Sequence, residues 1–369
     1  MSTPTAKHPA EQDQSLQNWF ESLNALARRI AGNMDNSLRQ IDDINMQVRL
    51  LSFNAQVQAA KAGEAGRTFS VVANEIGNLS TKTARVAESL AAETRQDIKQ
   101  LAEISDRLAS DVSGNRFVDL ALTNIDLIDR NLYERSCDVR WWATDPSVVD
   151  ALSKPDSQSF RHASDRLGVI LNAYTVYFDI VLCDLSGTVV ANGRPDRFKS
   201  VGSSVLHCEW FQQALQSRSG NDFGFQSVHA SPLVSGKNIL TYSCGVRAGG
   251  EADGQLLGVL GILFNWESLA QTIVESTPIE AVDKSSVRVC IIDRSGNVLA
   301  DTRREILKDR LPIDPLTPLI QARKGFRIHE SSGQRQLFAL ATAPGYETYT
   351  TGWIGLIIQN LEKSSIKSP

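Results

Sequence analysis

Several features are scarce in this chain of 369 residues, and each scarcity excludes a class of protein. Its 5 cysteines are odd in number and form no CxxC pair, so we expect reduced thiols and no disulfide framework. The 38 basic residues face 42 acidic ones and form no dense run that would bind nucleic acid. The longest apolar run, LLGVLGILF, is about half of a bilayer span, and the amino terminus lacks the apolar core of an export signal. We therefore expect a cytoplasmic protein without a membrane span.

The first third of the chain has the pattern of a long helical hairpin. Two interlocked series of apolar residues recur every seven positions, one including Phe20, Ala27, Met34, Ile41 and Val48 and the other including Ile30, Ile44 and Leu51. Such a seam is too narrow for one helix to bury alone, so we expect the return leg of the chain to cover it. Gly63 and Gly66 interrupt the pattern with a permissive backbone, which predicts the turn of the hairpin.

The remainder of the chain begins with a second helical stretch and then changes texture. A weak break at residues 113–115 precedes a helix that we expect near residues 116–143. From Tyr177 onward, short apolar runs alternate with Gly, Asp and Ser, as antiparallel strands do. The segment VLCDLSGTVVAN is echoed by CIIDRSGNVLAD about a hundred residues later, which predicts two homologous sheet modules. Chance similarity between two hairpins is the alternative.

These patterns predict an α+β protein with a long antiparallel coiled-coil hairpin followed by a long helix and two antiparallel sheet modules. The expected boundaries are a disordered N-terminus at 1–14, the hairpin at 15–112 with its tip near 63–66, the long helix and first module at 115–280, the second module at 281–361, and a tail at 362–369.

Residues 41–80, IDDINMQVRLLSFNAQVQAAKAGEAGRTFSVVANEIGNLS, carry a specific motif. They resemble the kinase-control hairpin of methyl-accepting chemotaxis proteins, whose pattern is Asn-Ala-x-x-x-Ala-Ala-Arg-Ala-Gly-Glu-x-Gly-Arg-Gly-Phe-x-Val-Val-Ala-x-Glu. In that family, hairpins dimerise into four-helix bundles, the dimers assemble in trimers, and the tip docks a histidine kinase and its coupling adaptor. The resemblance implies tip contacts by Met46, Leu50, Phe53, Asn54, Val57, Gln58, Lys61, Glu64, Arg67 and Val71.

The motif departs from the family pattern at several positions. Gln58 replaces the usual Glu, Lys61 replaces Arg, and Thr68 replaces Gly. Because lysine lacks the planar fork of arginine, we expect weaker or different ionic contacts at the tip. A plain antiparallel coiled coil whose tip only turns is the structural alternative. In function, the alternative is a scaffold or decoy that binds the kinase or adaptor without ligand control.

The carboxy-terminal part resembles a double Cache sensor, in which two PAS-like sheet modules follow a long helix and the first module binds a small molecule. The resemblance rests on DVRWWATDPSVVDAL, FDIVLCDLSGTVVANG, WFQQAL and GVLGILFNWESL. It implies a ligand pocket formed by Asp179, Arg194, Trp210, His229 and Tyr242. Cys208 and Leu263 stand where amino-acid binders of this family carry an Arg and an Asp, so we expect an uncharged or singly charged ligand. An empty module that only dimerises is the alternative.

No residue pattern points to an enzyme, a cofactor or a metal site. Cys208 neighbours His207, but adjacent residues on a strand face opposite ways and no oxyanion hole is evident. The histidines lack metal-ligand spacing. Trp141 and Trp142 cannot share one helix face, so we expect one in the core and the other at an interface or pocket.

Overall fold

The computed structural model describes residues 9–280, 283–331 and 334–361, and the chain divides into two units, Met1–Ser113 and Gly114–Pro369. Helix α1 covers Pro9–Lys61 and a short 3-10 helix, η1, covers Gly63–Gly66. Helix α2 covers Arg67–Trp142 and therefore belongs to both units.

Two expectations about helix boundaries are corrected. The expected disordered N-terminus is helical from Pro9 onward, because proline is well suited to the first turn of a helix and the next residues are good helix formers. Residues 1–8 and the expected tail, 362–369, lie outside the described residues. The expected weak break at 113–115 is absent, since α2 continues through it. Gly114 is needed there because the ring of Phe326 fills the space of a Cβ atom, at 2.4 Å.

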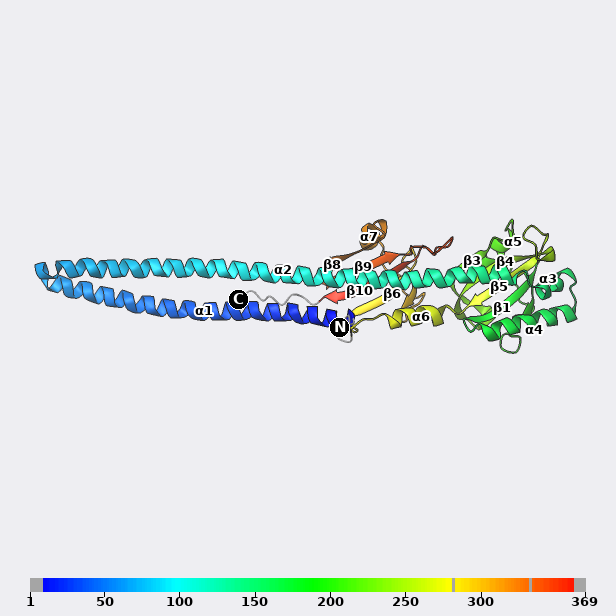
Figure 1. Cartoon of the computed structure of the whole chain (residues 1–369), viewed down its shortest axis with the longest axis horizontal. Helices are drawn as coiled ribbons and strands as arrows, with labels where there is room; N and C mark the ends of the chain where they lie inside the picture. Colours follow the sequence, from blue (N-terminus) through cyan, green and yellow to red (C-terminus); the bar gives the residue numbers. More distant parts are fainter. Residues whose placement is uncertain (1–8, 281–282, 332–333, 362–369) are drawn as a thin grey trace, which may run out of the picture. The chain divides into compact units, whose positions relative to one another are not determined.

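The first unit is an antiparallel pair of helices. The two legs run side by side on either side of the turn (Figure 1). Two hydrogen bonds between the legs show that they are antiparallel. Arg95 donates to Asp35 at 2.8 Å far from the turn, and Ser52 donates to the carbonyl of Ala73 at 2.7 Å nearer the turn. At about 1.5 Å per residue, the 53 residues of α1 extend for roughly 80 Å.

The second unit contains the end of α2, the remaining helices and all the strands that the described residues form. The helices are α3 (Pro146–Ser153), α4 (Ser157–Ala173), α5 (Glu209–Leu215), α6 (Trp266–Ser276) and α7 (Thr317–Gln321). The first five strands are β1 (Tyr177–Asp184), β2 (Val189–Asn192), β3 (Gly224–Ser231), β4 (Lys237–Arg247) and β5 (Leu256–Phe264). The other five are β6 (Val287–Ile292), β7 (Val298–Asp301), β8 (Lys324–Ser331), β9 (Gln334–Thr342) and β10 (Ile354–Leu361).

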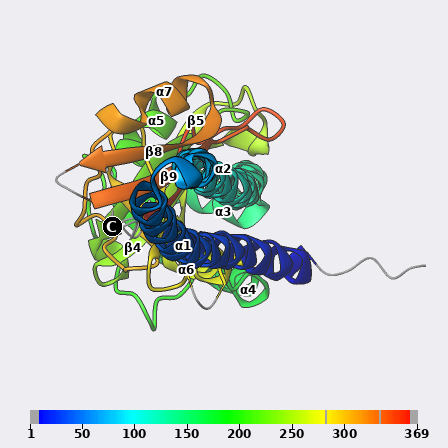
Figure 2. The same ribbon diagram turned by 90° about the vertical axis from the view of Figure 1, so that its left-hand side faces the viewer.

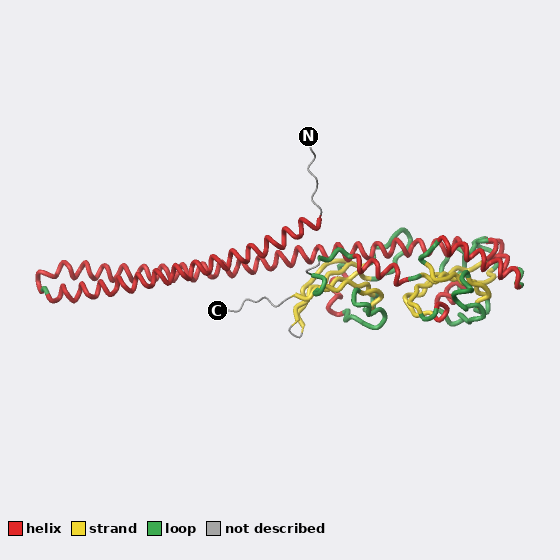
Figure 3. The backbone as a smooth tube through the Cα atoms, turned by 90° about the horizontal axis from the view of Figure 1, so that it is seen from below, coloured by secondary structure: helices red, strands yellow, loops and turns green. Residues whose placement is uncertain are grey.

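The strands form two antiparallel sheets of the same topology, which confirms the predicted α+β fold with two sheet modules. Their orders are β2-β1-β5-β4-β3 and β7-β6-β10-β9-β8. Figure 3 shows the strands as two separate groups, and α7 lies beside β8 and β9 (Figure 2). The repeated Asp-x-Ser-Gly segment forms the same turn twice. Asp184 and Asp293 each accept hydrogen bonds at 2.8–3.0 Å from the backbone N–H groups two and four residues later.

The core of the second unit lies between α2 and the two sheets. Ile125, Ile128 and Leu132 of α2 are fully buried in one cluster that includes residues of both sheets. The second sheet approaches α2 closely at Gly355, where a Cβ atom would lie 2.4 Å from the carbonyl oxygen of Ala121. A separate apolar cluster fills the opposite face of each sheet. The end of α2 is thus part of the core of the second unit.

Candidate functional site

The hairpin turn is made by glycines at the end of α1. Gly63 has φ of +59°, a conformation that glycine adopts without a steric penalty. A Cβ atom on Gly66 would lie 2.0 Å from the carbonyl oxygen of Ala59, so only glycine lets the chain fold back this closely. The next residue, Arg67, begins α2. The tip is therefore a tight reversal of the backbone.

The two legs pack through small residues, which the sequence analysis missed. One series of buried positions is spaced by seven and comprises Asn45, Ser52 and Ala59 in α1 and Gly66, Ala73, Ser80 and Ala87 around and in α2. Ala27, Ala91 and Ser105 are buried as well. Hydrogen bonds cross this stripe, since Ser80 donates to the carbonyl of Asn45 at 3.1 Å. The seven-residue spacing of small residues is present in the sequence, but the large apolar residues have the same spacing, so the pattern alone does not decide where the legs meet.

The expectation that the return leg covers the large apolar series is therefore wrong in part. Ala27 is buried, and Met34, Ile41 and Val48 are half-buried, but Ile44 and Leu51 are 58% and 65% exposed. The reason is geometric: two closely spaced helices cover one stripe of each other's surface, and the second stripe stays outside. A single chain thus leaves several large apolar side chains of this series unburied.

All ten residues that the resemblance assigns to the tip are exposed in the single chain. Phe53 and Val71 are 63% and 65% exposed. Glu64 and Arg67 lie 3.4 Å apart as an exposed ion pair, which stabilises the turn little. A cluster of exposed large apolar residues is typical of a protein-binding surface.

Asp179 and Arg194 of the predicted ligand pocket hold the backbone of the first sheet module. The buried Asp179 carboxylate accepts hydrogen bonds from the N–H groups of Ile180 and Arg194 and from the Asn192 amide, at 2.9, 3.0 and 2.7 Å. Burial raises the pKa of Asp179 to about 6, although the three hydrogen bonds act in the opposite direction and lower it. The Arg194 guanidinium donates to three backbone carbonyls at 2.7–2.8 Å. Both charged groups are thus engaged within the module.

Trp210 and Tyr242 belong to different core clusters, and the structure does not bring the five predicted residues together. Trp210 is 1% exposed and packs against Gly261, on the face of the sheet away from α2. Tyr242 faces the core that includes α2, and its hydroxyl lies 2.6 Å from that of Tyr349. His229 contacts the carbonyl of Ser227 through Nδ1 at 2.8 Å, and burial lowers its pKa. Trp210 projects from α5 onto one face of the sheet, whereas Tyr242 projects from β4 onto the other face, and sequence alone does not place either of them.

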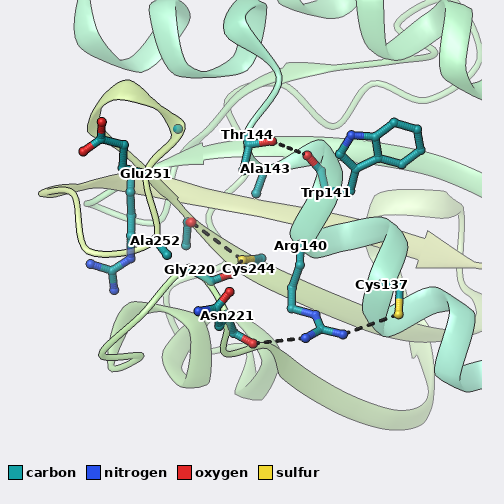
Figure 4. A pocket seen from close by; sticks show the side chains of 13 residues that line it. Cys137, Arg140, Trp141, Ala143, Thr144, Gly220, Asn221, Cys244, Glu251 and Ala252 are labelled. Atoms are coloured by element: carbon teal, nitrogen blue, oxygen red, sulfur yellow. Dashed lines mark hydrogen bonds between the residues drawn. The ribbon is translucent and has the colours of Figure 1, made fainter. Parts of the chain in front are cut away.

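Among the described residues, a cavity of about 460 Å³ lies at the C-terminal end of α2. Its lining includes Arg140 and Trp141 of α2 and Cys244 of β4 (Figure 4). Arg247 of β4 also lines it. Trp142 is buried, whereas Trp141 is 69% exposed, so the two tryptophans divide as expected between the core and a pocket. Trp210 lines neither this cavity nor three further cavities among the described residues, which have volumes of about 170–410 Å³.

The loop between β9 and β10 joins the two sheet modules to α2. The fully buried Asp129 carboxylate of α2 accepts hydrogen bonds from the N–H groups of Gly345 and Thr351, at 2.9 and 3.1 Å, and from the Thr351 hydroxyl at 2.6 Å. The same loop carries Tyr349, which reaches Tyr242 of the first sheet at 2.6 Å. One loop of the second module therefore contacts both α2 and the first module.

Comparison with known proteins gives separate answers for the two parts of the chain. Residues 1–134 match the family described as methyl-accepting chemotaxis protein (MCP) signalling domain. The chain is 52% identical over 50 residues to the methyl-accepting chemotaxis protein Amb0994 of Paramagnetospirillum magneticum, a stretch of 14% of this chain and 12% of that protein. It is 44% identical over 71 residues to McpA of Pseudomonas putida, 19% of this chain and 10% of that protein. The matched stretch thus spans about a tenth of the relatives' length.

Solved structures resemble the second unit. The ligand-binding domain of the Campylobacter jejuni chemoreceptor Tlp3 in complex with 4-methylisoleucine superposes with a TM-score of 0.51 at 15% identity, covering 68% of this chain and 92% of that one. The sensory domain of Tlp3 (CcmL) gives 0.51 at 16% identity, covering 68% and 94%. At these identities the likeness shows the fold. Within the described ranges, no helix is both long enough and apolar enough to cross a bilayer.

Proposed function

Because an MCP signalling domain precedes the fold of chemoreceptor sensory domains in this chain, we propose that it is a chemoreceptor-type signal transducer. The second unit senses a small molecule, and the hairpin tip controls a chemotaxis histidine kinase through its coupling adaptor. The observation that carries the proposal is the tip: a motif more specific than a coiled coil requires, with all ten of its assigned residues exposed.

Self-association follows from the exposed stripe on the hairpin. Ile44, Leu51, Leu79 and Val86 are each more than half exposed in the single chain. Burying apolar surface contributes about 25 cal/mol per Å², so a second copy that covers this stripe would be stabilised strongly. We therefore propose a homodimer whose tips assemble further into trimers of dimers.

The path of the signal is helix α2. It begins at Arg67, directly after the hairpin turn, and ends at Trp142 in the second unit. Its carboxylate Asp129 is held by the loop that also contacts the first sheet module. A ligand that alters the packing of the second unit thereby acts on the helix that forms one leg of the hairpin.

Tip variants test this function. Asn54→Ala and Arg67→Ala should abolish co-sedimentation with the kinase and adaptor, because both exposed side chains contribute to docking rather than to the hairpin itself. Asn78→Ala and Arg85→Ala, exposed on the same hairpin but farther from the tip, are the matched controls. Helicity and dimerisation should stay unchanged in all four. Binding that survives the two tip substitutions contradicts the proposal.

The departures from the family pattern at Gln58 and Lys61 favour one second candidate, a scaffold or decoy that occupies the kinase or adaptor without ligand control. Kinase activity measured in a reconstituted array separates the two functions. A transducer changes that activity when its ligand is added, and a scaffold does not.

A further inference from the structure

The cavity at the end of α2 is lined by two arginines that have no carboxylate partner among the described residues. Arg247 is 8% exposed, and its guanidinium donates to the carbonyls of Gly254 and Ser217 at 2.9 and 2.7 Å. Its Nε is buried and has no hydrogen-bond partner among the described residues. A buried guanidinium N–H without an acceptor is costly, which points to an acceptor that comes from outside the chain.

Arg140 faces the same cavity from α2. Its Nε donates to the carbonyl of Ser136 at 2.8 Å, and its terminal nitrogens contact the Asn221 carbonyl and the Cys137 sulfur, both at 3.4 Å (Figure 4). The guanidinium carbon also lies 5.8 Å from the centre of the Phe223 ring. Within the described parts of the chain, neither Arg140 nor Arg247 forms an ion pair. Both guanidinium groups are therefore available to an anion.

Acidic groups near the cavity offset this charge only in part. Glu251 is the one acidic residue of the lining, it is exposed, and Figure 4 shows its carboxylate on the side away from Arg140. Asp222 lies nearby, but its carboxylate accepts hydrogen bonds from the backbone N–H groups of Arg218 and Ser219, both at 3.1 Å. The lining thus carries two positive charges and one negative charge.

We propose that this cavity binds a small organic acid with a single carboxylate, which accepts hydrogen bonds from Arg247 and Arg140. A volume of about 460 Å³ suits a small molecule, and one negative charge matches the net charge of the lining. Ala143 and Ala252, which also line the cavity, provide apolar surface for the rest of the ligand. The site differs from the predicted pocket around Trp210, which lies in the cluster on the other face of the sheet.

The bound anion joins α2 to the first sheet module, because Arg140 belongs to α2 and Arg247 to β4. Resting on the proposed function, this contact makes the anion a regulator of the helix that leads to the hairpin. Binding itself is independent of the kinase, so the two proposals fail separately.

Calorimetric titration of the full chain with benzoate tests the site, with benzamide as the uncharged analogue and inorganic phosphate as the second anion. We expect benzoate to bind and benzamide not to bind. Arg140→Gln and Arg247→Gln should each weaken the binding at least tenfold. Arg218→Gln, which removes the same charge from an exposed position outside the lining, should leave it unchanged.

Equal binding of benzamide, equal effects of all three substitutions, or no binding of benzoate overturns the proposal. Binding of phosphate alone also overturns it, because the site would then select an inorganic anion. If Arg247→Gln does not fold, the test rests on the weaker benzoate binding expected of Arg140→Gln. Quenching of tryptophan fluorescence during the benzoate titration is then the second measurement, since Trp141 lies in the lining. Loss of benzoate binding with intact kinase docking defeats this inference only, and the reverse result defeats only the proposed function.

Discussion

Asp129→Asn replaces one oxygen of the carboxylate that joins α2 to the loop between β9 and β10. One oxygen accepts from the N–H and hydroxyl of Thr351, and the other accepts from the N–H of Gly345 and, at 3.4 Å, from the Thr350 hydroxyl. Whichever oxygen becomes an amide group, a backbone N–H of the loop loses its acceptor and faces another donor. Because the side chains of Asp and Asn have nearly the same size and shape, the variant changes this contact and leaves the packing around it intact.

The magnitude follows from those four hydrogen bonds. An unsatisfied buried donor costs about 1–3 kcal/mol, and the remaining bonds weaken because the acceptor is no longer charged. We expect the free energy of unfolding of the second unit to fall by about 3 kcal/mol. In a domain of this size, each kcal/mol of lost stability lowers Tm by about 2–4 °C, so the expected decrease in Tm is about 6–12 °C.

Thermal unfolding of the full chain, followed by tryptophan fluorescence, measures the effect. Five of the 6 tryptophans lie in Gly114–Pro369, so the signal reports mainly on the second unit. Asp119→Asn, exposed on the same helix, is the control and should leave Tm unchanged. A Tm of Asp129→Asn within error of the control would refute the reasoning that this carboxylate holds the loop to α2.

Two further predictions concern the hairpin and the first module. Gly66→Ala should lower the thermal stability of the hairpin, measured by circular dichroism, because the new Cβ would lie 2.0 Å from the Ala59 carbonyl oxygen. Gly32→Ala, which has open space around it, should instead raise helix stability by about 1 kcal/mol. Equal effects of the two substitutions would contradict the close approach of the chain at Gly66. Because burial raises the pKa of Asp179 to about 6, above the unfolded value of about 3.9, the folded chain binds more protons between these values, and stability from this group falls by about 1–3 kcal/mol as the pH rises through that window. The difference in unfolding free energy between the wild type and Asp179→Asn should therefore become smaller as the pH is raised from about 4 to about 7. A difference that does not change with pH would contradict the raised pKa of Asp179.

The sequence by itself determined the local features of this protein. Seven-residue spacing predicted the helical legs, glycines at 63 and 66 predicted where the chain turns, and the repeated Asp-x-Ser-Gly segments predicted two modules of one topology. These features depend on residues close together in the chain, where backbone preference and side-chain periodicity act directly.

Only the tertiary structure decided which surfaces meet. The sequence showed two apolar stripes but not that the legs pack through Ser52 and Ala73 and leave Leu51 exposed, because that choice depends on how closely two helices approach. Trp210 and Tyr242 looked like walls of one pocket, yet they lie in different clusters because their side chains project from different elements onto opposite faces of a sheet. The orphaned Nε of Arg247 likewise emerged only in the fold, since whether a polar group finds a partner depends on neighbours far away in the sequence.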